Sequence, residues 1–210
     1  MTMVRARAKV PEVGKREQNK LEKRERIRDA AERLFAKQGY EQTTIREVAE
    51  EAEVASGTVF LYARDKEDLL FLVMHERLRQ TSDDALATVP KRARLADAWA
   101  HVFGVIFQMY GKHEALARPF IRLLPGARGF NADLVNALTQ AFLQRLALQV
   151  QEAQGRGEVR ADVEPLQAAV TVFGLYFTAL MSWLSGYASA AELPQLFAQS
   201  LDLLFRGLKR

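Results

Sequence analysis

The chain has no cysteine and few histidines or prolines, three and six respectively among 210 residues. Without cysteine it has no disulfide, no thiolate metal site and no cysteine nucleophile, and we expect a reducing, cytoplasmic location. It also lacks a glycine-rich phosphate loop and a G-x-S-x-G turn, and His75, His101 and His113 stand apart in the sequence. We therefore expect no catalytic site, no metal and no cofactor.

Positive charge is concentrated at the N-terminus. Residues 1–28 hold ten Lys or Arg against four Glu, whereas the whole chain has a net charge of only +4. A basic N-terminus on a near-neutral body favours a polyanionic partner, although a solubilising tail would have the same composition. The N-terminus also lacks the apolar core of a secretory signal.

The sequence predicts a flexible basic arm followed by helices. Residues 1–19 show no hydrophobic periodicity and contain Pro11 and Gly14. From about Lys20 a helical apolar stripe begins, and Gly39 marks its end. The stripe consists of Ile27, Ala30, Ala31, Leu34 and Phe35.

Two short helices and a longer one are expected next. Thr44 and Glu47 have the spacing of a capping box, which predicts a helix that begins at this point. A third helix is plausible over Ser56–Tyr62. Asp65 offers an N-cap for a fourth helix, which runs to about Thr88 because Pro90 follows.

The remainder is also helical by its apolar spacing, and no period-2 strand, internal repeat or low-complexity tract occurs. The expected helices span Leu95–Tyr110, His113–Leu124, Asn131 (as cap) to about Gln154, Val163–Ser185 and Ala190–Leu208. The predicted fold class is therefore all-α, with about nine helices.

A specific string lies across the short helices. The blocks GYEQTTIREVA (39–49), SGTVFLY (56–62) and DKEDLL (65–70), with their spacing, closely resemble the DNA-binding domain of TetR-family transcriptional regulators. The resemblance covers residues 21–72. It implies a helix-turn-helix (HTH) domain over residues 20–66 and a helical ligand-binding and dimerisation domain over 67–210, after the arm 1–19.

The resemblance also implies roles for individual residues. Tyr62 and Lys66 match backbone-phosphate contacts, and Thr44 lies at a helix N-terminus, which attracts phosphate. The expected groove-facing residues are Ser56, Gly57, Thr58 and Leu61, with Arg46 reaching a base edge or a phosphate. Alternatives remain open at this point: Thr44 as a cap alone, Tyr62 as a core aromatic and Lys66 as a solvated side chain.

The third helix offers few strong base-reading groups, since it contains no Asn, Gln or Arg. We therefore expect specificity to depend on Arg46, on contacts with thymine methyls, on DNA shape and on the arm. The arm's basic residues are Arg5, Arg7, Lys9, Lys15 and Arg16.

Three residues depart from the family pattern. Glu53 replaces the glycine of the turn, so a non-glycine residue is expected at positive φ. Ala55 replaces a serine cap, which shifts any capping to Ser56. Ala63 replaces a phenylalanine and thins the packing between the third and fourth helices.

The stretch Leu166–Ala191 carries no charge. It is long enough to test as a membrane span, but its polar residues and the lack of a basic flank favour a helix buried on every side. Small residues recur every four positions at Gly174, Thr178, Ser182 and Gly186. With the last helix, this helix is expected to form a homodimeric four-helix bundle, as the resemblance implies; an internal pair in a monomer is the alternative.

The middle helices are rich in aromatic residues, and the resemblance implies that some of them line a cavity for a small, mainly apolar or aromatic effector. The candidate lining residues are Trp99, Phe103, Phe107, Tyr110, Phe142, Phe173 and Phe177, with His101, Gln108 or Arg122 as polar anchors. Effector binding would swing the Asp65–Thr88 helix and release a palindromic operator, which makes the protein a repressor. A helical scaffold that never contacts double-stranded DNA is the alternative class.

Overall fold

The computed structural model describes residues 14–208, and the predicted arm residues 1–13 lie outside the described residues. Within this range every regular element is a helix, as expected for an all-α protein. The helices are α1 (Lys15–Gln38), α2 (Ile45–Glu51), α3 (Ser56–Val59), α4 (Lys66–Ala87), α5 (Leu95–Lys112), α6 (Glu114–Leu123), α7 (Phe130–Gly155), α8 (Pro165–Leu184) and α9 (Leu193–Leu208).

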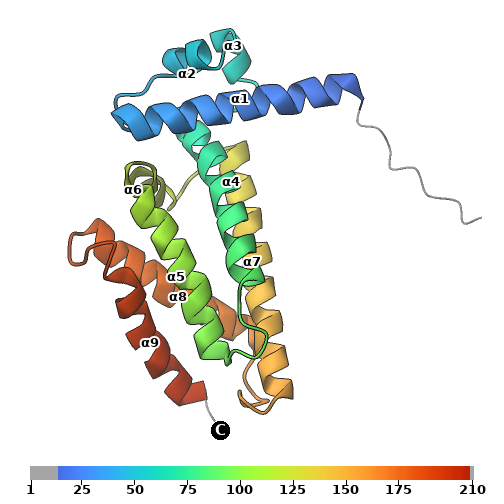
Figure 1. The fold of residues 1–210 in the computed structure, drawn as a ribbon, viewed down its shortest axis with the longest axis vertical. Helices are drawn as coiled ribbons and strands as arrows, with labels where there is room; N and C mark the ends of the chain where they lie inside the picture. The colour runs from blue at the N-terminus through green and yellow to red at the C-terminus, as the bar shows by residue number, and fades with distance from the viewer. Residues whose placement is uncertain (1–13, 209–210) are drawn as a thin grey trace, which may run out of the picture.

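The helices form two groups that α4 connects (Figure 1). α1 lies across one end of the molecule, and α2 and α3 lie on the side of α1 away from the remaining helices. α1 packs on α4 and α6, and α4 continues between α5 and α7. The small group closes around Ile27, Phe35, Val48 and Val59, none of which is exposed to solvent. α1, α2 and α3, which we call the HTH unit, therefore pack together, and the side of α2 and α3 that faces away from α1 is open (Figure 1).

Several predicted helix starts differ from the structure: α8 begins at Pro165 rather than Val163, α9 begins at Leu193 rather than Ala190, and the starts of α1 and α7 are also wrong. α1 begins at Lys15 rather than near Lys20, so residues 15–19 of the predicted arm are helical. These residues are exposed and have no apolar stripe, but Lys, Arg, Glu and Gln are good helix formers that extend an existing helix. Asn131 is not the cap of α7: Gly129 holds that position, and Asn131 is buried in the first turn.

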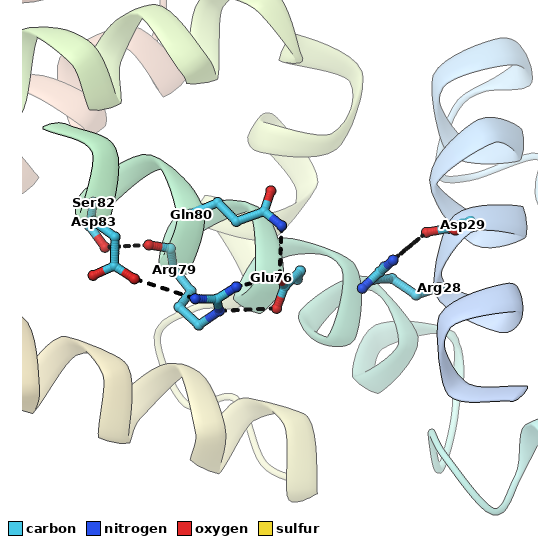
Figure 2. A network of polar contacts seen from close by, with 7 residues as sticks. All are labelled: Arg28, Asp29, Glu76, Arg79, Gln80, Ser82 and Asp83. Atoms are coloured by element: carbon cyan, nitrogen blue, oxygen red, sulfur yellow. Dashed lines mark hydrogen bonds and ion pairs between the residues drawn. The ribbon is translucent and has the colours of Figure 1, made fainter. Parts of the chain in front are cut away.

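Figure 2 shows polar side chains of α4 that bind one another around Arg79, with the Arg28–Asp29 pair of α1 beside them. Arg79 binds the Glu76 carboxylate at 2.7 Å, which lowers the pKa of Glu76. On the same helix Arg77 pairs with Glu32 of α1, and its Nη1 lies 2.7 Å from Nε2 of His113, between α5 and α6. α1, α4 and the start of α6 are thus tied together by one arginine.

Aromatic side chains from α5, α8 and α9 make the core of the larger group. Phe103 lies with its ring centre 4.8 Å from Phe197 and 5.1 Å from Tyr176. Trp99 is fully buried, donates from Nε1 to Gln149 at 3.0 Å and meets Phe205 edge to face. These contacts fix α5 as the central helix of the group.

α8 passes a length and composition test for a membrane span, with a mean hydropathy of 1.4 over its most apolar window. In this fold α8 packs on α7 and α9, and core helices of helical proteins pass the same test. Only 39% of that window is buried in the single chain. The prediction of a helix buried on every side is therefore wrong for one copy, because a second, uncharged face stays uncovered.

Candidate DNA-binding site and effector cavity

The capping box predicted at the start of α2 is confirmed. The Thr44 hydroxyl accepts from the Glu47 amide at 3.2 Å, and the Glu47 carboxylate accepts from the Thr44 amide at 2.8 Å. The hydrogen bonds that the Thr44 amide and the Thr44 hydroxyl donate to the Glu47 carboxylate lower the pKa of Glu47. Because both end amides are engaged, α2 begins at a fixed residue next to an exposed Thr44.

The turn after α2 contains the positive-φ residue that the family resemblance implies. Glu53 has a φ of 54°, the only such value for a non-glycine residue within 14–208. The Val54 amide donates to Ala49 O at 2.9 Å, and the Glu53 amide donates to Glu50 O at 3.1 Å. This pair of bonds is a Schellman motif with Glu53 in the left-handed position. The turn that aims α3 is therefore built despite the missing glycine.

α3 begins at Ser56 as predicted, but its N-cap differs from the prediction. The N-cap is Ala55, which has no side-chain capping bond, and Ser56 is already the first helical residue. The shift of capping to Ser56 is thus wrong. The hydroxyl of Ser56 is left facing outward instead, since Ser56 is exposed.

α3 itself is shorter than the predicted Ser56–Tyr62. The regular helix ends at Val59, and residues 60–62 continue as a tight turn in which the Tyr62 amide donates to Val59 O at 2.9 Å. Val59 is buried, whereas Phe60 and Leu61 are 55% and 79% exposed. An apolar side chain as open as Leu61 contributes little to the core and is available to a partner.

Lys66 has structural contacts in addition to its expected role. Its ammonium donates to Tyr40 O at 3.1 Å and to Glu41 O at 3.0 Å, and it lies 4.5 Å from the centre of the Tyr40 ring. Burial raises the pKa of Tyr40 to about 12, with nearby carboxylates adding to the shift. Lys66 therefore braces the turn between α1 and α2, with at most one N–H left to point outward.

The eight residues proposed for DNA contact lie on α2 or at its N-cap, on α3, in the turn after α3 and at the first residue of α4, and α2 packs on α3. Arg46 is 84% exposed in its side chain and pairs through Nε with Glu50 at 2.9 Å. Tyr62 and Thr58 are half-buried, and Tyr62 packs on the edge of the core. None of the eight is buried; they are Thr44, Arg46, Ser56, Gly57, Thr58, Leu61, Tyr62 and Lys66.

An apolar cavity lies among α4 to α8. Its volume is about 60 Å³, which is room for about two water molecules. No charged side chain lines it. The lining residues are Leu78, Ser82, Phe103, Ile106, Tyr110, Phe120, Leu124, Val135, Leu138, Thr139, Phe142, Phe173, Tyr176, Phe177 and Leu180.

Five of the seven predicted effector residues line this cavity and two do not. Phe103, Tyr110, Phe142, Phe173 and Phe177 are in the lining. Trp99 and Phe107 are fixed in the core against α9 instead, at Phe205 and Phe197. Their spacing on α5 marks a buried face, and spacing alone does not separate a core face from a cavity wall.

The predicted polar anchors lie elsewhere. His101 is bound to the Thr88 hydroxyl at 2.9 Å, and Gln108 and Arg122 are exposed. Among the polar groups of the cavity, the hydroxyl of Tyr110, which the sequence prediction includes, and that of Tyr176, which it missed, bind each other at 2.9 Å. The lining hydroxyls of Ser82 and Thr139 were also missed. Burial raises the pKa of Tyr110 to about 12 and that of Tyr176 well above 10. Both stay neutral, so the cavity is uncharged.

Within 14–208 no three His, Asp or Glu side chains gather as metal ligands do. The uncovered face of α8 carries the small residues Gly174, Thr178 and Ser182, which are exposed or half-buried. A Cβ added at Gly174 would meet nothing within 4 Å. The face is thus flat, uncharged and open to another helix.

Known proteins resemble this chain both in the HTH unit and along most of its length. The family profile described as bacterial regulatory proteins, tetR family, matches residues 27–73. The HTH-type transcriptional repressor KstR of Mycolicibacterium smegmatis is 30% identical over 191 residues, 89% of this chain and 87% of KstR. The fatty acid metabolism regulator protein of Bacillus subtilis is 26% identical over 186 residues, 87% of this chain and 93% of that protein.

A solved structure agrees over the whole fold. Thermus thermophilus FadR, a transcriptional repressor solved in complex with lauroyl-CoA, is 25% identical with a TM-score of 0.72, over 89% of this chain and 96% of FadR. The agreement with KstR and FadR extends far beyond the HTH unit into the cavity helices. The chain belongs to the TetR family of transcriptional regulators.

Proposed function

We propose that this regulator is a homodimeric repressor that binds a palindromic DNA operator and leaves it when an acyl-CoA or a similar apolar effector enters the cavity. Residues 20–66 form the DNA-binding domain and residues 67–210 the effector and dimer domain. The protein works in the cytoplasm, where its operator lies.

The open outer side of the HTH unit carries the DNA-binding part of this proposal. Ser56 and Leu61 are exposed on a segment that is anchored through the buried Val59, and Arg46 is exposed on α2. Such a segment fits the major groove, where Leu61 would meet thymine methyls and Arg46 a guanine edge or a phosphate. The helical residues Lys15, Arg16 and Lys20 extend the basic surface along α1.

The open face of α8 supports the dimer. A second copy that packs its own α8 and α9 there would cover the small-residue stripe around Gly174 and the exposed Leu203. A two-fold axis would then place two HTH units about one DNA turn apart, which requires a palindromic site.

Gly174→Leu separates dimerisation from folding. The single chain has open space at Gly174, so leucine is accommodated there, while the close approach of a second α8 is blocked. We expect a folded monomer in sedimentation. Gly155→Leu, also in open space but at the end of α7, is the matched control and remains a dimer. A Gly174→Leu protein that stays dimeric contradicts this interface.

The uncharged, aromatic cavity supports an effector with an apolar chain. A relative of the same fold was solved in complex with lauroyl-CoA. The cavity of about 60 Å³ is far below the roughly 300 Å³ of a typical ligand site, so an acyl chain has to move the walls apart. The charged part of a CoA ester has no partner among the lining residues and would stay at the surface.

One experiment tests both parts. Duplexes that the protein retains are selected from random DNA, and release of the best duplex is titrated with lauroyl-CoA. Acetyl-CoA is the matched control because it has the same charged part without the long chain. We expect retention that weakens with salt, and release by lauroyl-CoA only. If the selection yields no retained duplex, the DNA-binding proposal is contradicted. If lauroyl-CoA and acetyl-CoA release the duplex equally well, an apolar cavity site is contradicted.

A further inference from the structure

The first turn of α7 reaches into the DNA-binding unit. Asn131 has no exposed surface, and its Nδ2 donates to the carbonyl of Tyr62 at 2.8 Å, across 69 residues of sequence. Its Oδ1 is buried without a partner. An unpaired buried acceptor destabilises a fold, and a leucine of similar size would not have one. The hydrogen bond from Asn131 to Tyr62 therefore explains why position 131 holds an asparagine rather than an apolar residue of similar size.

Asp68 completes the contact from the other side. This buried carboxylate accepts from the Asn131 amide at 3.0 Å through Oδ1 and from the Arg64 amide at 3.0 Å through Oδ2. Gly129 permits the approach, because its φ is 126° and a Cβ there would lie 2.8 Å from the carboxylate. We call these four residues, Tyr62, Asp68, Gly129 and Asn131, the α7 joint.

The same helix forms one wall of the effector cavity. Val135, Leu138 and Phe142 of α7 line it, and Val135 follows Asn131 by four residues, about 6 Å along the helix. A helix transmits displacement as a rod over such a distance. Because the cavity has room for about two waters only, any effector that enters displaces its walls, α7 among them.

We propose that Asn131 is a positioning residue for DNA binding, through which α7 carries effector occupancy to the Tyr62 backbone. The inference rests on the proposed function and adds to it a second route beside α4. Tyr62 closes the tight turn that follows α3, so a displacement of its carbonyl tilts the segment that contains Leu61. Effector entry at Phe142 is thereby coupled to the fit of α3 in the groove.

Asn131→Leu removes the bond to Tyr62 and also the unpaired Oδ1. Its matched control is Asn136→Leu, the same substitution at an exposed position of the same helix. The first measurement is hydrogen exchange of residues 60–66 in the free protein, with no DNA and no effector. We expect about fivefold faster exchange in Asn131→Leu, the loss of about one hydrogen bond, and no change in Asn136→Leu.

The second measurement is the ratio of operator affinities without and with lauroyl-CoA. We expect this ratio to fall about fivefold in Asn131→Leu while lauroyl-CoA itself still binds and the melting temperature stays near that of the wild type. A merely structural asparagine would change the melting temperature and leave the ratio intact. Unchanged exchange at 60–66, or an unchanged ratio, overturns the proposal.

Gly129→Ala supplies an independent perturbation should Asn131→Leu not fold. Its Cβ displaces Asp68, whereas Gly126→Ala, at a φ of 82° in the same loop with nothing within 4 Å, has the backbone strain alone. If hydrogen exchange of residues 60–66 is faster in Gly129→Ala but not in Gly126→Ala, the α7 joint is supported. Equal exchange in the two variants contradicts it. If the wild-type protein binds no operator, or does not release it with lauroyl-CoA, the proposed function is refuted. The hydrogen-exchange data test the α7 joint independently of that result.

Discussion

Replacing Glu53 with glycine is expected to stabilise the protein. Glu53 is exposed and occupies the left-handed position of the Schellman motif after α2, at a φ of 54°. A left-handed conformation costs a non-glycine residue about 1–2 kcal/mol. Glycine loses more entropy on folding, about 0.5–1 kcal/mol. The difference leaves a gain of about 0.5–1 kcal/mol, or a rise in melting temperature of about 1–4 °C for a chain of this length.

Thermal unfolding of Glu53→Gly and Glu53→Ala separates the backbone effect from loss of the carboxylate. Alanine keeps the Cβ and therefore the strain, so we expect Glu53→Ala to melt near the wild type. Glycine alone should melt higher, with DNA affinity unchanged because the turn keeps its shape. If alanine stabilises as much as glycine, or if glycine destabilises, the argument from backbone strain is refuted.

Three further predictions concern the cavity and α2. Tyr110→Phe leaves the Tyr176 hydroxyl buried and unpaired, so chemical denaturation should show a loss of about 1–3 kcal/mol in the free energy of unfolding. The double variant with Tyr176→Phe should recover part of that loss. A double variant less stable than the single one contradicts this. Burial raises the pKa of Tyr110 from 10 to about 12, so the contribution of its neutral hydroxyl to stability is complete below pH 10 and is lost as the pH rises towards 12. The melting temperature should therefore fall less steeply with pH above 10 in Tyr110→Phe than in the wild type. Identical slopes in the two proteins refute the reasoning. Thr44→Ala removes the capping hydroxyl and should cost about 1 kcal/mol of unfolding free energy, whereas Thr44→Ser should cost little; equal losses would mean that the cap contributes nothing.

Features set by local chemistry could be predicted from the sequence. The capping box at Thr44 and the N-cap at Asp65 each depend on residues within a few positions of one another, and both are present. The positive φ at Glu53 is also present, but the family resemblance rather than local chemistry implies it. The helical class likewise follows from apolar spacing. The start of α1 could not be predicted in this way, because residues 15–19 form a helix without burying a face.

Features set by contacts between distant segments escaped the sequence analysis. Asn131 has the residue type of a cap, but its partner Tyr62 lies 69 residues away and the observed cap, Gly129, lies two residues earlier. Trp99 and Phe103 are on the same helix and equally buried, yet only Phe103 faces the cavity. Which aromatic side chain lines a cavity depends on where α7 and α8 pack, and a single helix pattern does not contain that information.

The most direct test of DNA contact is the affinity of Leu61→Ala for the selected duplex and for a scrambled duplex. Leu61 is 79% exposed, so its removal leaves the fold intact, and Leu148→Ala on α7 is the matched exposed control. Partial burial of a leucine against thymine methyls contributes about 1 kcal/mol, so we expect about fivefold weaker binding to the selected duplex alone. Equal affinities of Leu61→Ala and wild type for the selected duplex would contradict the placement of this segment in the groove.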